Sequence, residues 1–161
     1  MSLAIDPVEL PRRGRPLARN EILRAGRLAG MAADDLAAQF GTPCYIYDLG
    51  VIERQVAALR AVLPARAELA YAVKANPALA IVTQMGLLGL GADVASGGEL
   101  TTALCAGIDP RRIVMTGPGK RDVELDQGVR AGIHAVTVES LGELARLERI
   151  AADAGRCQPV M

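Results

Sequence analysis

Lys74 is the residue whose position first indicates chemistry. It stands near the end of an apolar run, residues 69–73, and is followed by Asn76 and Pro77, which are typical of a helix start. Desolvation disfavours the charged ammonium, so a lysine at such a site either meets a carboxylate or becomes a neutral amine, the nucleophile that forms Schiff bases. The alternative is a lysine whose stem lies along the rim of a sheet while its head reaches water.

Asp93 is the carboxylate best placed to meet this lysine. It lies in the next strand-like run, residues 91–95, at a height comparable with that of Lys74. Two interpretations overlap. Asp93 orients the lysine or a cofactor, or it neutralises a buried cation that would be costly without a partner. Both predict that Asp93 supports Lys74.

Other polar residues carry weaker signals. Ser96 and Glu99 form a capping box, Ser-x-x-Glu, which explains both residues without a ligand. The Gly-Pro-Gly-Lys sequence at 117–120 either presents backbone N–H groups to an anion or turns the chain away from a strand. His134, the single histidine, begins a strand at its amino end, where we expect a solvated side chain. The glycines of residues 86–91 lack the spacing of a dinucleotide fingerprint, so NAD is not expected.

A regular alternation of strands and helices positions these residues. Strand-like runs begin about 20 residues apart, the period of a βα unit rather than a hairpin. They lie at residues 69–74, 91–95, 112–116, 134–138 and 158–161. Helices are predicted between them, with stops at Gly86, Gly107, Gly132 and Gly155 and a second capping box at residues 140–143. The class is α/β, and periodicity alone fits either part of a (β/α)8 barrel or a small doubly wound sheet.

The region upstream of Lys74 is less regular. Residues 1–20 hold three Pro and four Arg without an apolar period and are typical of an extended lead-in. A short helix is predicted at 31–40 with a stop at Gly41, then a strand at 44–47, then a helix capped by Asp48. We divide the chain into a partly irregular lead-in, 1–40, and a second segment, 41–161.

Three motifs together resemble a known family. They are Tyr-Ala-Val-Lys-Ala-Asn-Pro at 71–77, Gly-Ala-Asp-Val-Ala-Ser-Gly-Gly-Glu-Leu at 91–100 and Thr-Gly-Pro-Gly-Lys at 116–120. In this order and spacing, the segment 41–161 resembles the N-terminal barrel half of the diaminopimelate, ornithine and arginine decarboxylases of PLP fold type III, and most closely the diaminopimelate branch. The related alanine racemases continue differently after the lysine. The resemblance favours a partial (β/α)8 TIM-like barrel.

The resemblance implies a site and an activity. Lys74 would form the internal aldimine with pyridoxal 5'-phosphate, and Asp93 would contact the lysine or the cofactor. The implied reaction is decarboxylation of a small-molecule amino acid, as in lysine biosynthesis, by an enzyme that is a homodimer at full length. No residue here selects the amino acid. A non-catalytic protein that binds PLP or a partner on the same fold is the competing hypothesis. In the family the strand at 44–47 belongs to a second, all-β domain, so we expect it to lack its sheet.

Composition excludes several classes of protein. Acidic and basic residues balance at 18 each, which gives no electrostatic basis for a nucleic-acid or membrane partner. No apolar stretch approaches the length of a membrane span, and no metal-binding cysteine pattern is present. The three cysteines, Cys44, Cys105 and Cys157, are predicted to be reduced core residues of a cytoplasmic protein.

The number of predicted strands limits what the 161 residues can do. A TIM barrel closes with eight strands and commonly holds phosphate after the seventh and eighth, whereas the pattern here reaches only the opening of a fifth. We therefore expect a truncated fragment that is inactive by itself and prone to aggregate.

Overall fold

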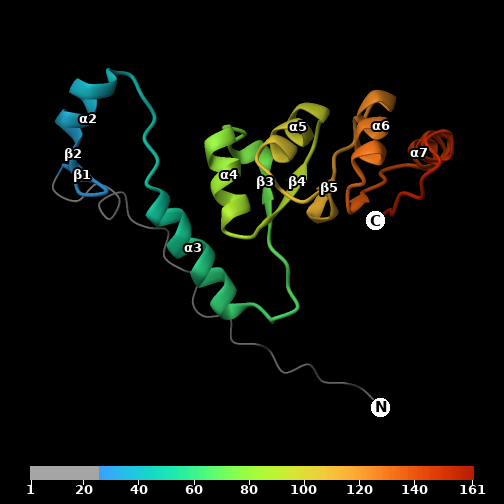
Figure 1. The fold of residues 1–161 in the computed structure, drawn as a ribbon, viewed down its shortest axis with the longest axis horizontal. Coiled ribbons are helices and arrows are strands. Elements are labelled where there is room, and N and C mark those ends of the chain that lie inside the picture. Colours follow the sequence, from blue (N-terminus) through green and yellow to red (C-terminus); the bar gives the residue numbers. More distant parts are fainter. Residues whose placement is uncertain (1–25) are drawn as a thin grey trace, which may run out of the picture. The chain divides into compact units, whose positions relative to one another are not determined.

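The computed structural model describes residues 26–161. The chain divides into two compact units, residues 1–58 and 59–161, and each is described here by itself (Figure 1). The lead-in predicted for residues 1–20 lies outside the described part of the chain.

The first unit contains a small hairpin, one complete helix and the beginning of a second. Strands β1 (Arg27–Leu28) and β2 (Met31–Ala32) pair in antiparallel fashion and lead into helix α2 (Ala33–Phe40). The helix predicted at 31–40 is therefore correct except for its first two residues, which belong to the hairpin. Helix α3 (Leu49–Val62) starts where Asp48 was predicted to cap it, since the Asp48 Oδ1 accepts the Gly50 N–H at 2.9 Å. The strand predicted at 44–47 is not formed, because no neighbouring strand pairs with it there.

The second unit is a parallel sheet with helices between its strands. The strands are β3 (Ala70–Ala72), β4 (Gly91–Val94), β5 (Ile113–Met115) and β6 (Ala135–Val136). The helices are α4 (Leu79–Leu87), α5 (Gly97–Cys105), α6 (Asp122–Ala131) and α7 (Leu141–Asp153). Two short 3-10 helices, η1 (Val73–Ala75) and η2 (Pro110–Arg112), complete the unit.

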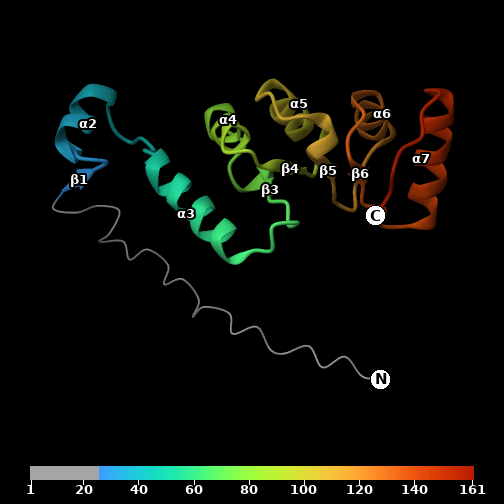
Figure 2. The same cartoon turned by 60° about the horizontal axis from the view of Figure 1, so that its bottom comes forward.

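Sheet order identifies the architecture. The order is β3-β4-β5-β6, the same as in the chain, and α4 to α7 follow one another in the same sequence (Figures 1 and 2). A doubly wound sheet reverses its strand order at a switch point, whereas a barrel does not. The fold is therefore a partial (β/α)8 barrel, as predicted. The predicted fifth run is present as a parallel bridge from Val160 to Val136.

The core lies between the sheet and the helices. Val94, Met115 and Val136 occupy successive strands, Val73 directly follows β3, and all four are completely buried. Since side chains alternate along a strand, the preceding residue on β4, Asp93, points to the opposite face and is half-buried. The core is built mainly from aliphatic side chains, with Met85 and Met115 among them.

Most helix ends follow the glycines. Gly107, Gly132 and Gly155 each take a left-handed φ just after α5, α6 and α7, as predicted. The stop predicted at Gly86 is wrong, because α4 continues to Leu87 and Gly89 takes the left-handed conformation. Gly86 serves close packing instead: a Cβ there would lie 3.1 Å from Cγ1 of Ile108.

The cysteine prediction is also corrected. Cys44, Cys105 and Cys157 are free, but all three are exposed rather than in the core. Cys105 falls on the solvent side of α5, where apolar character alone does not secure burial. In the described residues, no helix has both the length and the apolar character that crossing a membrane requires.

Candidate functional site

Lys74 lies at the carboxyl end of β3, in the single turn η1. The predicted strand 69–74 is shorter than expected, because hydrogen bonding to β4 ends at Ala72 and a turn begins. Val73 is fully buried and anchors the turn, and the Asn76 N–H closes it on the Val73 carbonyl at 3.1 Å. The Lys74 side chain is exposed. The turn therefore presents the amine beyond the end of the strand.

Two polar groups fix the chain on the far side of Lys74. The Tyr71 hydroxyl donates to the Asn76 carbonyl at 3.2 Å, and the Asn76 Oδ1 accepts the Ala78 N–H at 3.0 Å. The prediction that Asn76 caps a helix beginning at Pro77 is wrong. Helix α4 begins at Leu79, because Asn76 and the residues after it form a separate turn.

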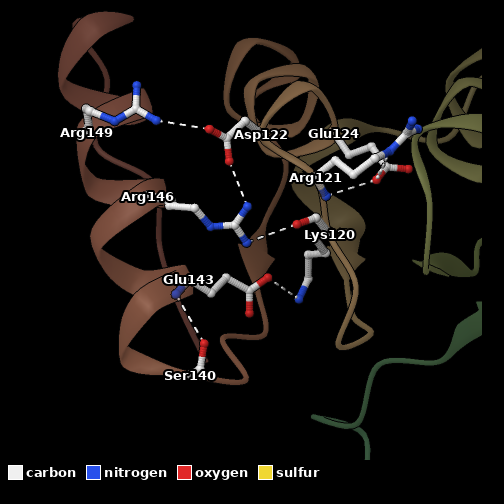
Figure 3. Close-up of polar contacts among 8 residues, drawn as sticks. All are labelled: Lys120, Arg121, Asp122, Glu124, Ser140, Glu143, Arg146 and Arg149. Carbon is white, nitrogen blue, oxygen red and sulfur yellow. Dashed lines mark hydrogen bonds and ion pairs between the residues drawn. The ribbon is translucent and has the colours of Figure 1, made fainter.

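The second lysine of the sequence, Lys120, has the opposite environment. Only 1% of its side chain is exposed, and its Nζ lies 2.9 Å from the Glu143 Oε1 (Figure 3). The Nζ also donates to the carbonyls of Gly117 and Thr137, the latter at 2.7 Å. By contrast, within residues 26–161 the Lys74 amine makes no hydrogen bond or ion pair. Of the two lysines, only Lys74 offers an amine that can react without breaking the fold.

Asp93 lies on the strand next to Lys74. It is in register with Ala72, two residues before the lysine. Its Oδ1 accepts the hydroxyl of Thr116, which follows β5, at 2.8 Å. The described residues show no ion pair between Asp93 and Lys74, so the structure brings the two strands together without pairing the two charges. Thr116 was not singled out from the sequence, and its place directly after a strand was the signal for it.

The remaining candidates have structural roles. The Ser96 Oγ accepts the Glu99 N–H at 3.2 Å, which confirms the predicted cap of α5. In a standard capping box the glutamate carboxylate accepts the N–H of the capping serine. The Glu99 carboxylate instead accepts the N–H of the residue before that serine, Ala95, at 2.8 Å. The 117–120 segment acts as a turn, since the Gly117 carbonyl binds Lys120. His134 is exposed just before β6, as predicted.

Two carboxylates near Lys120 have lowered pKa values. Burial raises the pKa of Glu143, but the Glu139 N–H and the Lys120 ammonium outweigh it and leave the pKa below its ordinary value. The Arg121 side chain and the N–H groups of Gly97 and Arg121 lower the pKa of Glu124 to about 2. Both carboxylates therefore act as fixed negative charges at neutral pH.

The residues at the carboxyl ends of β3 and β4 fit an aldehyde cofactor. The primary amine of Lys74, which is exposed and has no partner within residues 26–161, is the nucleophile that an aldehyde requires. A carboxylate on the adjacent strand, Asp93, can balance positive charge on the lysine or on a ligand. In barrels of this type the carboxyl ends of the strands form the catalytic face.

Comparisons with known proteins agree with this arrangement. The family model described as "Pyridoxal-dependent decarboxylase, pyridoxal binding domain" matches residues 49–160. Diaminopimelate decarboxylase of Pseudomonas aeruginosa is 40% identical over 132 residues, which cover 81% of this chain and 32% of that protein. The same enzyme of Aquifex aeolicus is 43% identical over 129 residues, which cover 80% and 30%.

Solved structures give the same result. The crystal structure of AQ1208 from Aquifex aeolicus matches with a TM-score of 0.81 and 42% identity, covering 83% of this chain and 33% of that one. Diaminopimelate decarboxylase from Helicobacter pylori complexed with L-lysine matches with a TM-score of 0.76 and 36% identity, covering 80% and 33%. The chain thus spans about a third of the length of the relatives it matches.

Proposed function

Because this chain belongs to the pyridoxal-dependent decarboxylases, through their pyridoxal-binding domain, we propose that it binds pyridoxal 5'-phosphate covalently through Lys74 and serves amino-acid decarboxylation. The relatives named above favour the diaminopimelate branch. The substrate class we propose is therefore a diamino acid, and the reaction is that of a carboxy-lyase.

One observation carries the choice of residue. The sequence has two lysines, and their environments differ in every respect that matters for reactivity. Lys120 is buried and held by three acceptors, whereas Lys74 is exposed at the end of a strand. A nucleophilic amine must be able to reach the aldehyde, and Lys74 is the lysine whose amine is accessible.

Each group has a distinct role. When bound, the cofactor supplies an aldehyde for attachment and a ring that withdraws electrons from the bond to the departing carboxylate. Lys74 provides the amine for attachment. Asp93 provides negative charge on the neighbouring strand, and the Thr116 hydroxyl fixes the orientation of that carboxylate.

The proposal extends to assembly and location. The resemblance favours a homodimer for the full-length form. The three free cysteines favour a reducing compartment, and we place the protein in the cytoplasm. The competing function, a non-catalytic protein that holds the cofactor or a partner, predicts attachment at Lys74 without turnover.

The test is to attach pyridoxal phosphate to the chain and to map the lysine that carries it. The folded chain is incubated with pyridoxal phosphate, reduced with borohydride and digested, and we expect the pyridoxyl mass on the peptide that contains Lys74. Lys74→Arg is the matched control, since it keeps the charge but removes the reactive amine. A label on Lys120 in the folded protein contradicts the proposal. Release of CO₂ from diaminopimelate by the full-length form separates the enzyme from the non-catalytic alternative.

A further inference from the structure

The side chain of Tyr71 joins the core to the turn that carries Lys74. Tyr71 lies on β3 in register with Ala92, which is in register with Ile113 on β5. Ala92 and Ile113 are completely buried, and the Tyr71 ring packs against the same core. Its hydroxyl extends past the end of the strand and donates to the Asn76 carbonyl at 3.2 Å. One side chain therefore links the helix-covered face of the sheet to the residue two positions after Lys74.

The turn needs such a link. A single 3-10 turn closes with few hydrogen bonds and has little stability of its own. Val73 fixes the amino side of the turn through burial, and the Asn76 N–H bonds back to the Val73 carbonyl. These contacts hold the turn together but do not tie its carboxyl side to the sheet. The Tyr71 hydroxyl provides that tie.

The side chain of Lys74 has no anchor of its own. It is exposed and makes no hydrogen bond or ion pair within residues 26–161. The direction in which its amine reaches is therefore set by the backbone from which it projects. A reacting amine must approach its aldehyde in a defined geometry, and small displacements of the supporting backbone reduce the rate.

We infer that Tyr71 is a positioning residue for Lys74: its hydroxyl holds the 73–76 turn so that the lysine amine meets the aldehyde of the cofactor. The inference rests on the proposed function and adds to it a residue that does not touch the reacting atoms. Tyr71 acts through the Asn76 carbonyl and the peptide backbone, not through the lysine side chain.

The test removes one oxygen atom. Tyr71→Phe keeps the ring in the core and deletes only the hydroxyl. Tyr45→Phe is the matched control, since Tyr45 is 92% exposed. The rate of pyridoxal phosphate attachment to Lys74 is measured by borohydride trapping and peptide mapping. A second rate is measured with a small acetylating reagent, which needs only an exposed amine. Both are normalised to the folded fraction from a urea titration of each variant.

We expect Tyr71→Phe to slow attachment of pyridoxal phosphate at Lys74 about fivefold, the factor that corresponds to losing one hydrogen bond. Acetylation of Lys74 should stay at the wild-type rate, and Tyr45→Phe should change neither rate. If both rates change together, or neither changes, Tyr71 is a structural residue only and the inference is overturned. If the wild-type chain carries no pyridoxyl label on Lys74, the proposed function itself has failed, which is a different result.

Discussion

The two lysines of this chain lie at the same edge of one parallel sheet, but Lys120 is buried and paired whereas Lys74 is exposed. Lys74 comes two residues after the end of β3, and Lys120 comes five residues after the end of β5. Lys120 is enclosed by the β5–α6 turn, the chain after β6 and the first turn of α7, all of which supply acceptors. Lys74 projects from a turn whose last residue, Asn76, bonds to Tyr71 and Ala78 and not to the amine.

The difference shows that position at a strand end does not determine what a lysine does. A buried ammonium must have all its protons accepted, and once they are, the group is structural. An ammonium left without partners costs little in water and stays available for a ligand. The acceptors around each amine, and not its place in the sequence, separate the two roles.

The largest expected effect comes from breaking the buried pair. Lys120→Met leaves the Glu143 carboxylate buried without its cation, and we expect the free energy of unfolding to fall by about 3–5 kcal/mol. Lys74→Met removes an exposed side chain without partners in the described structure, and it should change stability by less than about 0.5 kcal/mol. Urea denaturation of the two variants and the wild-type chain measures both values.

A double variant controls for packing. Lys120→Met with Glu143→Leu removes both charges, so much of the lost stability should return. Equal losses for Lys74→Met and Lys120→Met would contradict the comparison, because they would mean that Lys74 also has a structural partner.

An intermediate effect is expected from acid. Glu124 accepts the Gly97 N–H at 2.9 Å and the Arg121 N–H at 3.1 Å, and so connects α6 to the first turn of α5. Its pKa falls from 4.5 to about 2. A carboxyl with a lowered pKa stabilises the fold above its unfolded pKa, and the contribution is lost as the pH falls through the folded value.

Glu124→Gln should therefore cost about 1–2 kcal/mol at pH 7, because the amide NH2 group cannot accept the hydrogen bonds that one of the two carboxylate oxygens accepts. The difference between the variant and the wild type should shrink as the pH is lowered from about 4.5 towards about 2. Stability measured across that range by urea titration checks both statements. A constant difference would mean that the charge of Glu124 does not contribute. For Lys74→Met, by contrast, the difference in free energy of unfolding from the wild type should not change over this pH range.

Local sequence signals predicted much of this fold. The glycines at 107, 132 and 155 end their helices because only local backbone geometry decides a helix end. The serines at 96 and 140 cap theirs for the same reason. Gly86 shows the limit of that reasoning. Gly86 allows its helix to pack closely against Ile108. This contact joins two separate elements, so it cannot be read from the residues next to Gly86.

The site was predictable in part, for the same physical reason. The motif around Lys74 drew attention to the end of β3, since a lysine after an apolar run is a local feature. The Lys120–Glu143 pair joins residues 23 positions apart, and the Asp93–Thr116 bond joins another such pair. Each depends on strand register, which the sequence indicates only through its period. Asn76 was misassigned because its backbone and side chain serve a turn that the Tyr71 hydroxyl stabilises.

The smallest expected effect concerns the two serine caps. Ser96 and Ser140 each accept the N–H of the glutamate three residues on, at 3.2 Å and 3.1 Å. Those glutamates each accept an N–H from the residue before the serine, at 2.8 Å in both cases. The two caps differ in one respect: Glu143 also binds Lys120, whereas Glu99 does not.

We expect Ser96→Ala and Ser140→Ala each to cost about 1 kcal/mol, because the bond lost is the same. Urea denaturation of both variants gives the values. If Ser140→Ala costs more by about 0.5 kcal/mol or above, the cap and the buried pair are coupled, as contacting residues often are. The interaction that holds Lys120 would then also stabilise the first turn of α7.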